Sequence, residues 1–287
     1  MRWERGRRSK NVIDRRGSAP RRRGGKMMGG GLGMLVLLLV ALFFGVDPRM
    51  VMDMGGGISP PAGTPTQQAP RSTQENELAE FVKVILADTE DVWHGIFQQN
   101  GWQYQEPRLV LFSGATNSGC GFAQSAMGPF YCPGDQQVYI DLVFYDELKN
   151  RFGAPGDFAQ AYVIAHEVGH HVQTLLGISA QVQQAKARSS KTDANAIQVR
   201  MELQADCMAG LWANHAHKAR NLLEKGDIEE GLTAAAAIGD DTLQRQAQGY
   251  VVPESFTHGS AKQRQEWFVR GLRSGDLSVC DTFSGNI

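Results

Sequence analysis

Residues 162–177 read Tyr-Val-Ile-Ala-His-Glu-Val-Gly-His-His-Val-Gln-Thr-Leu-Leu-Gly, and this stretch decides the fold. It contains His166 and His170, four positions apart, which places both side chains on the same face of a helix. Two imidazoles in this arrangement can bind one zinc ion. Glu167 follows the first histidine and can take a proton from a water molecule at the metal. We interpret the stretch as a metal-binding helix, although a helix with two core histidines and a surface glutamate would show the same pattern.

The flanking residues favour a helix of about this length. Asp157 is a candidate N-cap, with Gln160 three positions later as its capping-box partner. Gly177 is a typical helix end. The interior is rich in Ala, Val and Ile, which predicts a buried helix.

A third metal ligand is expected, because a catalytic zinc usually has three protein ligands and one open position. In the glutamate-type metallopeptidases, which the histidine motif resembles, this ligand comes from a following helix, as Glu-x-x-x-Asp. Glu202 stands 32 positions after His170 and begins the segment Glu-Leu-Gln-Ala-Asp, which ends at Asp206. Glu202 can bind the metal. Asp206, one turn later, can accept the remaining N–H of a ligand histidine and fix its orientation. The Glu-x-x-x-Asp pattern alone is common on solvated helices, but after the histidine pair and inside the apolar run 199–212 it indicates the same metal site.

The charge of the chain is unevenly distributed. Its 287 residues carry a net charge of −1, yet residues 1–26 hold eleven basic and two acidic side chains. The rest of the chain is therefore acidic, which argues against a body that binds nucleic acid. A basic arm beside an acidic body indicates two different surroundings. A nucleic-acid-binding tail is the alternative, but the next segment explains the charge more simply.

An apolar stretch follows the basic residues. Residues 27–46 form twenty uncharged positions, just enough to span a bilayer as a helix. The positive-inside rule then places the N-terminus in the cytoplasm and the body outside. We expect a basic, disordered cytoplasmic tail (1–26), a transmembrane anchor in the inner membrane (27–46), a flexible linker (47–74) and one folded domain (75–287). A cleaved signal peptide is the alternative, but the stretch offers few small residues for a cleavage site.

The four cysteines contain no C-x-x-C pair, and the metal motif has its ligands without them. In a domain outside the cytoplasm, an even count favours two disulfides. We expect Cys120–Cys132, which closes a short loop, and Cys207–Cys280, which ties the second metal helix to the C-terminal end. Free buried thiols remain the alternative, because cysteine is often buried.

The folded domain is expected to be α+β, mostly helical, with a small sheet. Apolar spacing and composition predict helices over residues 77–98, 145–149, 196–223 and 227–248. Residues 107–113, with the apolar run 109–112, and residues 137–141 are predicted to be strands. Residues 178–195, between the two metal helices, could form a helix, a loop or a lid.

Two side chains near the C-terminal end are candidates for stabilising charge on a substrate. Negative charge develops on the substrate oxygen during hydrolysis, and an imidazole or a guanidinium can stabilise it. His258 and Arg264 can supply these groups. A surface histidine and a solvated arginine are the alternatives. His94, His215 and His217 are predicted to be surface residues.

The histidine pair, the segment Glu202 to Gly210 and the segment Ser125 to Cys132 together resemble the bacterial "putative neutral zinc metallopeptidase" family. The basic tail and the single anchor are similar to this family too, so that the resemblance covers almost the whole chain. It implies a minimal zincin-type domain in which Zn²⁺ is bound by His166, His170 and Glu202.

Two further expectations accompany the resemblance. In metallopeptidases of this type an exposed strand lies above the metal helix and pairs with an extended substrate, and residues 137–141 are our candidate, with an ordinary sheet strand as the equal alternative. The segment Thr257 to Arg264 is similar to one in membrane-associated zinc peptidases. It departs from that segment by Gly259, which replaces a proline.

These observations together predict a zinc-dependent endopeptidase that acts on proteins or peptides in the cell envelope, with Glu167 and His258 as its candidate catalytic residues. A zinc-stabilised adaptor without activity is the alternative from another class. A structural zinc site, however, favours four protein ligands and needs no base. A metal-dependent cell-wall amidase would use the same chemistry. The sequence identifies no substrate and no oligomeric state.

Overall fold

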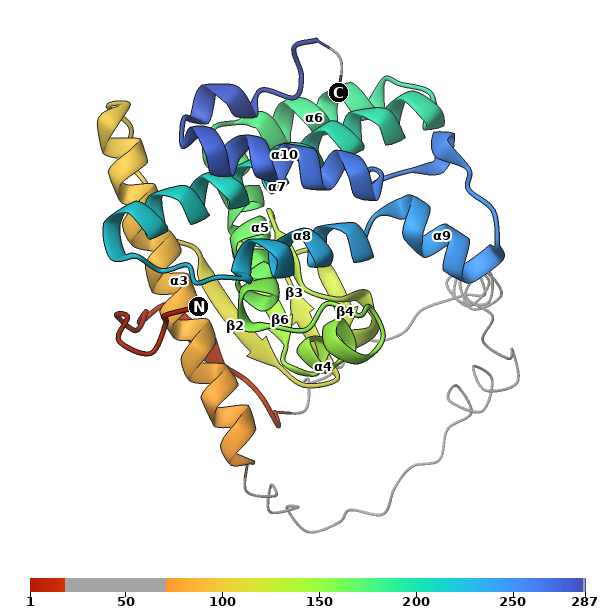
Figure 1. Ribbon diagram of the computed structural model, residues 1–287. Helices are drawn as coiled ribbons and strands as arrows, with labels where there is room; N and C mark the ends of the chain where they lie inside the picture. The colour runs from red at the N-terminus through yellow and green to blue at the C-terminus, as the bar shows by residue number, and fades with distance from the viewer. Residues whose placement is uncertain (19–70, 286) are drawn as a thin grey trace, which may run out of the picture. The chain divides into compact units, whose positions relative to one another are not determined.

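The structure is a computed structural model, and it describes residues 1–18, 71–285 and 287. The predicted anchor (27–46) and most of the predicted linker (47–74) lie outside the described residues. Within the described part of the chain, no helix combines the length and the apolar character that crossing a membrane requires. The predicted α+β class with a small sheet is confirmed, and helices make up most of the fold (Figure 1).

The elements follow one another with short connections. The α-helices are α3 (Thr73–Gln99), α4 (Val143–Asn150), α5 (Asp157–Leu175), α6 (Ile178–Ala187), α7 (Lys191–Arg220), α8 (Asp227–Ala237), α9 (Asp240–Gln248) and α10 (Ala261–Ser274). The strands are β1 (Val12–Asp14), β2 (Arg108–Phe112), β3 (Ala115–Ser118), β4 (Gly121–Gln124), β5 (Phe130–Cys132) and β6 (Gln137–Asp141). Short 3₁₀ helices are η1 (Ser125–Met127), η2 (Pro253–Ser255) and η3 (Leu277–Cys280).

The main sheet has the strand order β1-β2-β6-β5, and β3 pairs with β4 in a separate hairpin. β1, β2 and β6 are parallel, while β5 runs antiparallel to β6. The prediction of a strand over 137–141 is confirmed by β6. The prediction that this strand has an edge free for substrate is wrong, because β2 and β5 occupy its two edges. The outer strand on this side is β5.

The first eighteen residues belong to the folded domain, which corrects the prediction of a structureless basic arm. Val12 of β1 pairs with Leu109 of β2. Trp3 packs edge-on against Phe81 of α3, with ring centroids 5.3 Å apart. In Figure 1 the N-terminus lies beside the long helix α3. The domain therefore includes residues 1–18 in addition to the predicted segment from residue 75.

Ion pairs explain why a basic segment can join this domain. Glu90 on α3 is fully buried, and its carboxylate accepts hydrogen bonds from Arg7 (2.7 Å), Ser9 (2.5 Å) and Asn11 (2.8 Å). The basic segment and the acidic body, which the sequence analysis assigned to different surroundings, are thus complementary surfaces of one domain.

The shared sheet also corrects the predicted membrane topology. Residues 1–18 and the chain from Arg71 onward form one unit. A single membrane crossing between them would place a bilayer between the hydrogen-bonded strands β1 and β2. A cytoplasmic N-terminus with the catalytic domain on the other side is therefore incompatible with this sheet.

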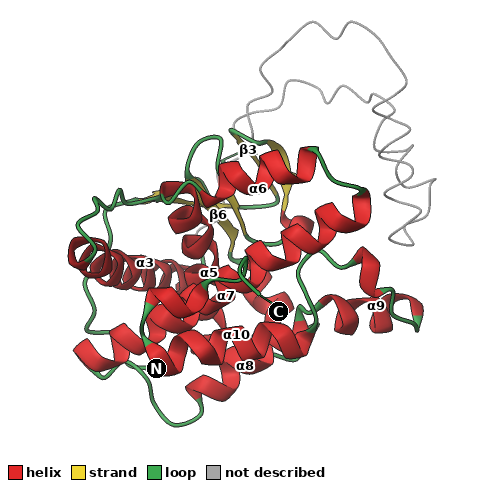
Figure 2. Ribbon diagram, turned by 90° about the horizontal axis from the view of Figure 1, so that it is seen from above, coloured by secondary structure: helices red, strands yellow, loops and turns green. Residues whose placement is uncertain are grey.

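Helices α5, α7 and α10 pack around the site (Figures 1 and 2). α7 and α10 touch at Gly210 and Gly271. A Cβ at Gly210 would lie 2.0 Å from the carbonyl oxygen of Phe268, and one at Gly271 would lie 1.9 Å from that of Cys207. Only glycine allows this approach, which brings the C-terminal half of α10 against the middle of α7.

Two local predictions change in the structure, and one open question is answered. The N-cap of α5 is Gly156, and Asp157 is the first helical residue, where its carboxylate binds the Met1 ammonium group. The predicted helix over 227–248 is two helices, α8 and α9, separated at Gly239. The segment 178–195, which the sequence left open, contains helix α6 and the first turn of α7. The predicted end of α5 at Gly177 is confirmed, since this residue has a left-handed φ of +76°.

Candidate metal centre and active site

Helices α5 and α7 bring the three predicted metal ligands together. The Nε2 atoms of His166 and His170 lie 3.2 and 3.4 Å from the same carboxylate oxygen of Glu202. All three ligand atoms lie within 4.8 Å of one another. Gly169 favours this close approach, since a Cβ there would lie 3.2 Å from the Cα of Ala205 on α7, a tight contact. The glycine inside the histidine motif is therefore a packing residue for the second metal helix.

The donor set fits a catalytic zinc ion. Two imidazoles and one carboxylate are ligands that zinc uses in hydrolytic enzymes, where a fourth position stays open. Each histidine uses its Nδ1 atom for another partner, Asp206 for His166 (2.8 Å) and Gln173 for His170 (2.8 Å). Both Nε2 atoms are thereby left for a metal. The arrangement of the ligand atoms and their orienting partners supports zinc at this position.

Asp206 lies behind His166, as predicted, and belongs to a buried cluster. Its carboxylate accepts two hydrogen bonds from Arg264, Nε to Oδ2 at 2.8 Å and Nη2 to Oδ1 at 2.9 Å, and another from the Tyr162 hydroxyl. Burial opposes the charge on Asp206, but Arg264 and His166 outweigh it and lower the pKa of Asp206 to about 2. The carboxylate therefore stays ionised behind the metal ligand.

The same carboxylates attract positive charge to the ligand atoms. Burial disfavours the charged form of His166, but Asp206 and Glu202 raise the pKa of His166 to about 10. Burial likewise opposes the charge on Glu202, yet His170 and His166 hold its pKa well below the usual range. These pKa shifts show that the negative charge of the site favours a bound proton on the histidines. A divalent cation is favoured at this position by the same negative charge.

Arg264 orients Asp206, and its geometry differs from that of an oxyanion-stabilising residue. It is almost fully buried, and besides its two bonds to Asp206 it donates to the Tyr162 hydroxyl (3.1 Å) and to the carbonyl of Ile238 (3.3 Å). Four of its five N–H groups are used in this way. Its role in the structure is therefore to hold the residue that orients His166.

We expect Arg264→Met to destabilise the domain and weaken the metal site. Removal of one partner of a buried ion pair costs about 3–5 kcal/mol, because Asp206 would remain charged or would have to take up a proton. Loss of the orienting group should also lower zinc affinity by about 10- to 100-fold. Arg264→Lys should have a stability and a zinc affinity between those of wild type and Arg264→Met, since lysine keeps the charge without the two-pronged geometry.

Urea unfolding and zinc competition with a chromophoric chelator measure the two effects of Arg264→Met. The control is Arg273→Met, an exposed arginine on the same helix. An Arg264→Met protein as stable as wild type would contradict the role of this ion pair.

Glu167 faces the same cavity as the metal ligands. The cavity has a volume of about 420 Å³, and its polar lining includes Glu167, His166, His170, Glu202 and His258. The Glu167 side chain is buried, and its carboxylate has no hydrogen-bond partner among the described residues. It is thus free to exchange a proton with a molecule in the cavity.

His258 reaches the cavity from the connection before α10. Asp240, the first residue of α9, accepts the backbone N–H groups of Thr257, His258 and Gly259 at 2.6–2.9 Å and lies 3.2 Å from the His258 Nδ1 atom. Partial burial lowers the pKa of His258, but Asp240 and Glu202 raise it above its ordinary value overall. The side chain is half exposed, and its Nε2 atom has no protein partner in the described part of the chain. His258 can therefore present an N–H to a substrate.

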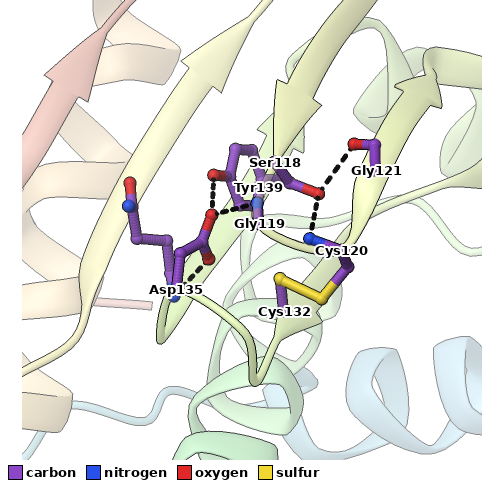
Figure 3. Close-up of a disulfide and its surroundings, with 8 residues drawn as sticks. Ser118, Gly119, Cys120, Gly121, Cys132, Asp135 and Tyr139 are labelled. Atoms are coloured by element: carbon purple, nitrogen blue, oxygen red, sulfur yellow. Dashed lines mark hydrogen bonds between the residues drawn. A yellow bond between two sulfur atoms is a disulfide. The ribbon is translucent and has the colours of Figure 1, made fainter.

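The predicted disulfides are both present. Cys120–Cys132 joins the turn of the β3–β4 hairpin to β5 (Figure 3). Next to it, Asp135 accepts hydrogen bonds from the Gly119 N–H and the Tyr139 hydroxyl, each at 2.6 Å. Cys207–Cys280 joins α7 to η3. The first disulfide fixes the segment that forms one wall of the cavity, and the second lies behind the metal ligands.

The histidines predicted to lie outside the site do so. His94 pairs with Glu106, and His215 and His217 contact Gly275 and Leu223 at the other end of α7. His171, directly after the second ligand, is fully buried and contacts the Tyr131 hydroxyl of β5 (3.2 Å) and the carbonyl of Gln105 (2.6 Å). It links the metal helix to the outer strand.

Sequence reasoning missed two residues of the site. Tyr162 stands four positions before His166 and Gln173 three positions after His170, so both lie on the ligand face of α5. Both are fully buried. Polar side chains at helical spacing from the ligands, in an otherwise apolar helix, are the signal that could have identified them.

Comparison with known proteins places the chain in a family. It is 51% identical to the uncharacterized protein YpfJ of Escherichia coli over a 301-residue alignment that covers all of both chains. It is 40% identical to the uncharacterized proteins Mb2605 of Mycobacterium bovis and Rv2575 of Mycobacterium tuberculosis over 260 residues, 85% of each chain. No solved structure matches. The model of the family described as "Putative neutral zinc metallopeptidase" matches residues 1–283, and the chain belongs to this family.

Proposed function

We propose that this protein is a zinc-dependent endopeptidase. The observation that carries the proposal is the convergence of the two histidine Nε2 atoms on the Glu202 carboxylate, in a cavity that also contains the unpartnered carboxylate of Glu167. The family description supports zinc and peptidase activity in general terms. Zinc bound by these ligands would polarise a substrate carbonyl and lower the pKa of water.

The protein groups around the metal position can perform the remaining steps. Glu167 takes a proton from water and later delivers it to the leaving amine. His258 donates a hydrogen bond to the substrate oxygen as negative charge develops there. His166 and His170 are held by partners at Nδ1, so that the ligand atoms need no rearrangement during the reaction.

The walls of the cavity support an extended peptide as the substrate. β5 is the outer strand on this side of the sheet. Residues 126–131, which include the start of β5, line the cavity. An extended chain can pair with such an edge. The apolar lining beyond the metal ligands includes Met127, Pro129, Phe130, Phe144, Phe152, Val163, Ile238 and Leu243. We expect large apolar side chains next to the cleaved bond.

We propose that the enzyme works outside the cytoplasm, on proteins or peptides of the cell envelope. Two disulfides support an oxidising compartment.

The lone carboxylate of Glu167 argues against a zinc-stabilised adaptor, since a structural zinc site has no use for a base.

A peptide library tests the proposed activity. The full-length protein with one zinc per chain should cleave a subset of the peptides, and removal of zinc by a chelator should abolish cleavage. Re-addition of zinc should restore it. Mass spectrometry of the products identifies the cleaved bonds, and we expect apolar residues beside them. Absence of cleavage by a zinc-loaded, folded protein would contradict the peptidase and direct attention to cell-wall amide bonds.

A further inference from the structure

A chain of buried amide groups leads away from His170. The Nδ1 atom of His170 contacts the Gln173 side-chain oxygen at 2.8 Å. The Gln173 amide nitrogen donates to the carbonyl of Met201 (2.7 Å) and to the side-chain oxygen of Gln204 (3.0 Å). The Gln204 nitrogen donates to the carbonyl of Cys280 (3.0 Å). Both glutamines are buried, with 0% and 5% of their surfaces exposed.

Two backbone carbonyls determine the direction of every hydrogen bond in this chain. A carbonyl oxygen can only accept, so Gln204 must turn its NH₂ group toward Cys280, and Gln173 must turn its NH₂ group toward Met201. The Gln173 oxygen then faces His170. His170 must therefore carry its proton on Nδ1, and its Nε2 lone pair is left for the metal.

The two zinc-binding histidines are thus held by different means. His166 has a charged partner, Asp206, which is itself bound to Arg264. His170 has a neutral partner whose orientation depends on a second glutamine. A neutral amide can accept or donate when it rotates, whereas a carboxylate always accepts. The orientation of Gln173 therefore needs the support that Gln204 provides.

The outer end of the amide chain lies at a disulfide. Cys280 supplies the last carbonyl and is bonded to Cys207, three residues after Gln204 on α7. The bond holds η3 and its carbonyl against α7. Without it, the Cys280 carbonyl would lose its covalent link to the helix that carries Gln204.

We propose that Gln173 and Gln204 position His170 for metal binding, and that the Cys207–Cys280 disulfide sustains this arrangement. The inference deepens the function proposed above and rests on its zinc site. It predicts that the oxidation state of the Cys207–Cys280 disulfide affects the affinity of the site for zinc. Neither glutamine touches the substrate, so both act as positioning residues.

Zinc affinity tests the coupling independently of peptide cleavage. It is measured by competition with a chromophoric chelator on the full-length protein. Gln173→Leu should lower the affinity by about 10- to 100-fold, the usual effect of losing a group that orients a metal ligand. Gln204→Leu should lower it by a smaller factor. The double variant Gln173→Leu, Gln204→Leu should match Gln173→Leu alone, because Gln204 acts through Gln173.

The two disulfides provide a matched pair of variants. Cys207→Ala with Cys280→Ala should lower zinc affinity, and should have no additional effect when Gln204→Leu is present. Cys120→Ala with Cys132→Ala removes the other disulfide, whose residues lie outside the amide chain, and should leave zinc affinity unchanged. The absorption spectrum of the cobalt-substituted protein should change in the Gln173→Leu variant and not in this control.

The possible outcomes separate the two proposals. A Gln173→Leu affinity within twofold of wild type, or additive effects of Gln204→Leu and the loss of Cys207–Cys280, overturns the coupling. If circular dichroism shows that Gln173→Leu does not fold, the zinc affinities of Gln204→Leu and of the two disulfide variants decide whether the coupling exists. A wild-type protein that binds zinc but cleaves no peptide contradicts the peptidase alone. A wild-type protein that binds no zinc contradicts both.

Discussion

Glu167→Gln should reduce peptide hydrolysis by about 10²- to 10⁴-fold and leave zinc binding unchanged. The substitution keeps the size of the side chain and removes its ability to take a proton. Glu167 lies in the cavity with the metal ligands. It is not one of the three residues whose ligand atoms lie within 4.8 Å of one another. Its loss should therefore affect the rate and not the metal content.

Three measurements on the same protein preparation test this expectation. The rate of cleavage of one good peptide gives kcat and KM, metal analysis gives zinc per chain, and circular dichroism reports folding. We expect kcat to fall with little change in KM. Glu229→Gln, an exposed carboxylate on α8, is the control and should have wild-type activity. Loss of zinc in the Glu167→Gln variant would show that Glu167 helps to bind the metal, and residual activity near wild type would exclude it as the base.

Deletion of residues 2–18 should destabilise the domain by at least several kcal/mol. Glu90 would lose its hydrogen bonds from Arg7, Ser9 and Asn11, and removal of the partner of a buried charge costs about 3–5 kcal/mol. The sheet would also lose β1 and expose the edge of β2, which favours association between molecules. We expect little soluble protein, or a molten and aggregating one.

Urea unfolding and light scattering measure the effect of the deletion. The control is Arg5→Ala, since Arg5 is exposed and makes no hydrogen bond or ion pair among the described residues. In the deleted protein, Glu90→Gln should restore part of the stability because it removes the buried charge. A deletion variant with wild-type stability would contradict the assignment of residues 1–18 to the domain.

The metal ligands could be predicted because they follow from local rules. A helix places residues four positions apart on one face, so the histidine pair identifies its own geometry. Glu202 required more, since its distance from His170 depends on how α5 and α7 cross. The close contact of Gly169 with Ala205 contributes to that crossing, and nothing in either segment alone indicates it.

The parts that the sequence did not reveal depend on contacts between distant segments. Arg264 resembled a free cation in the sequence, and only the packing of α10 on α7 turns it toward Asp206. The basic N-terminal segment resembled an arm for a different environment, because its acidic partners lie on a helix some 70 to 80 residues later. A strand of three residues such as β1 has too little pattern to be recognised without its neighbour.

The parallel pairing of β1 with β2 has a consequence for biogenesis. Val12 and Leu109 lie opposite each other in the sheet but are separated by 97 positions in the chain. During synthesis, β1 must therefore wait for its partner until the chain has been extended to β2. Contacts between such distant positions slow folding, because the long intervening segment must close into a loop first. Residues 12–14 can therefore reach their final place only after β2 has been made.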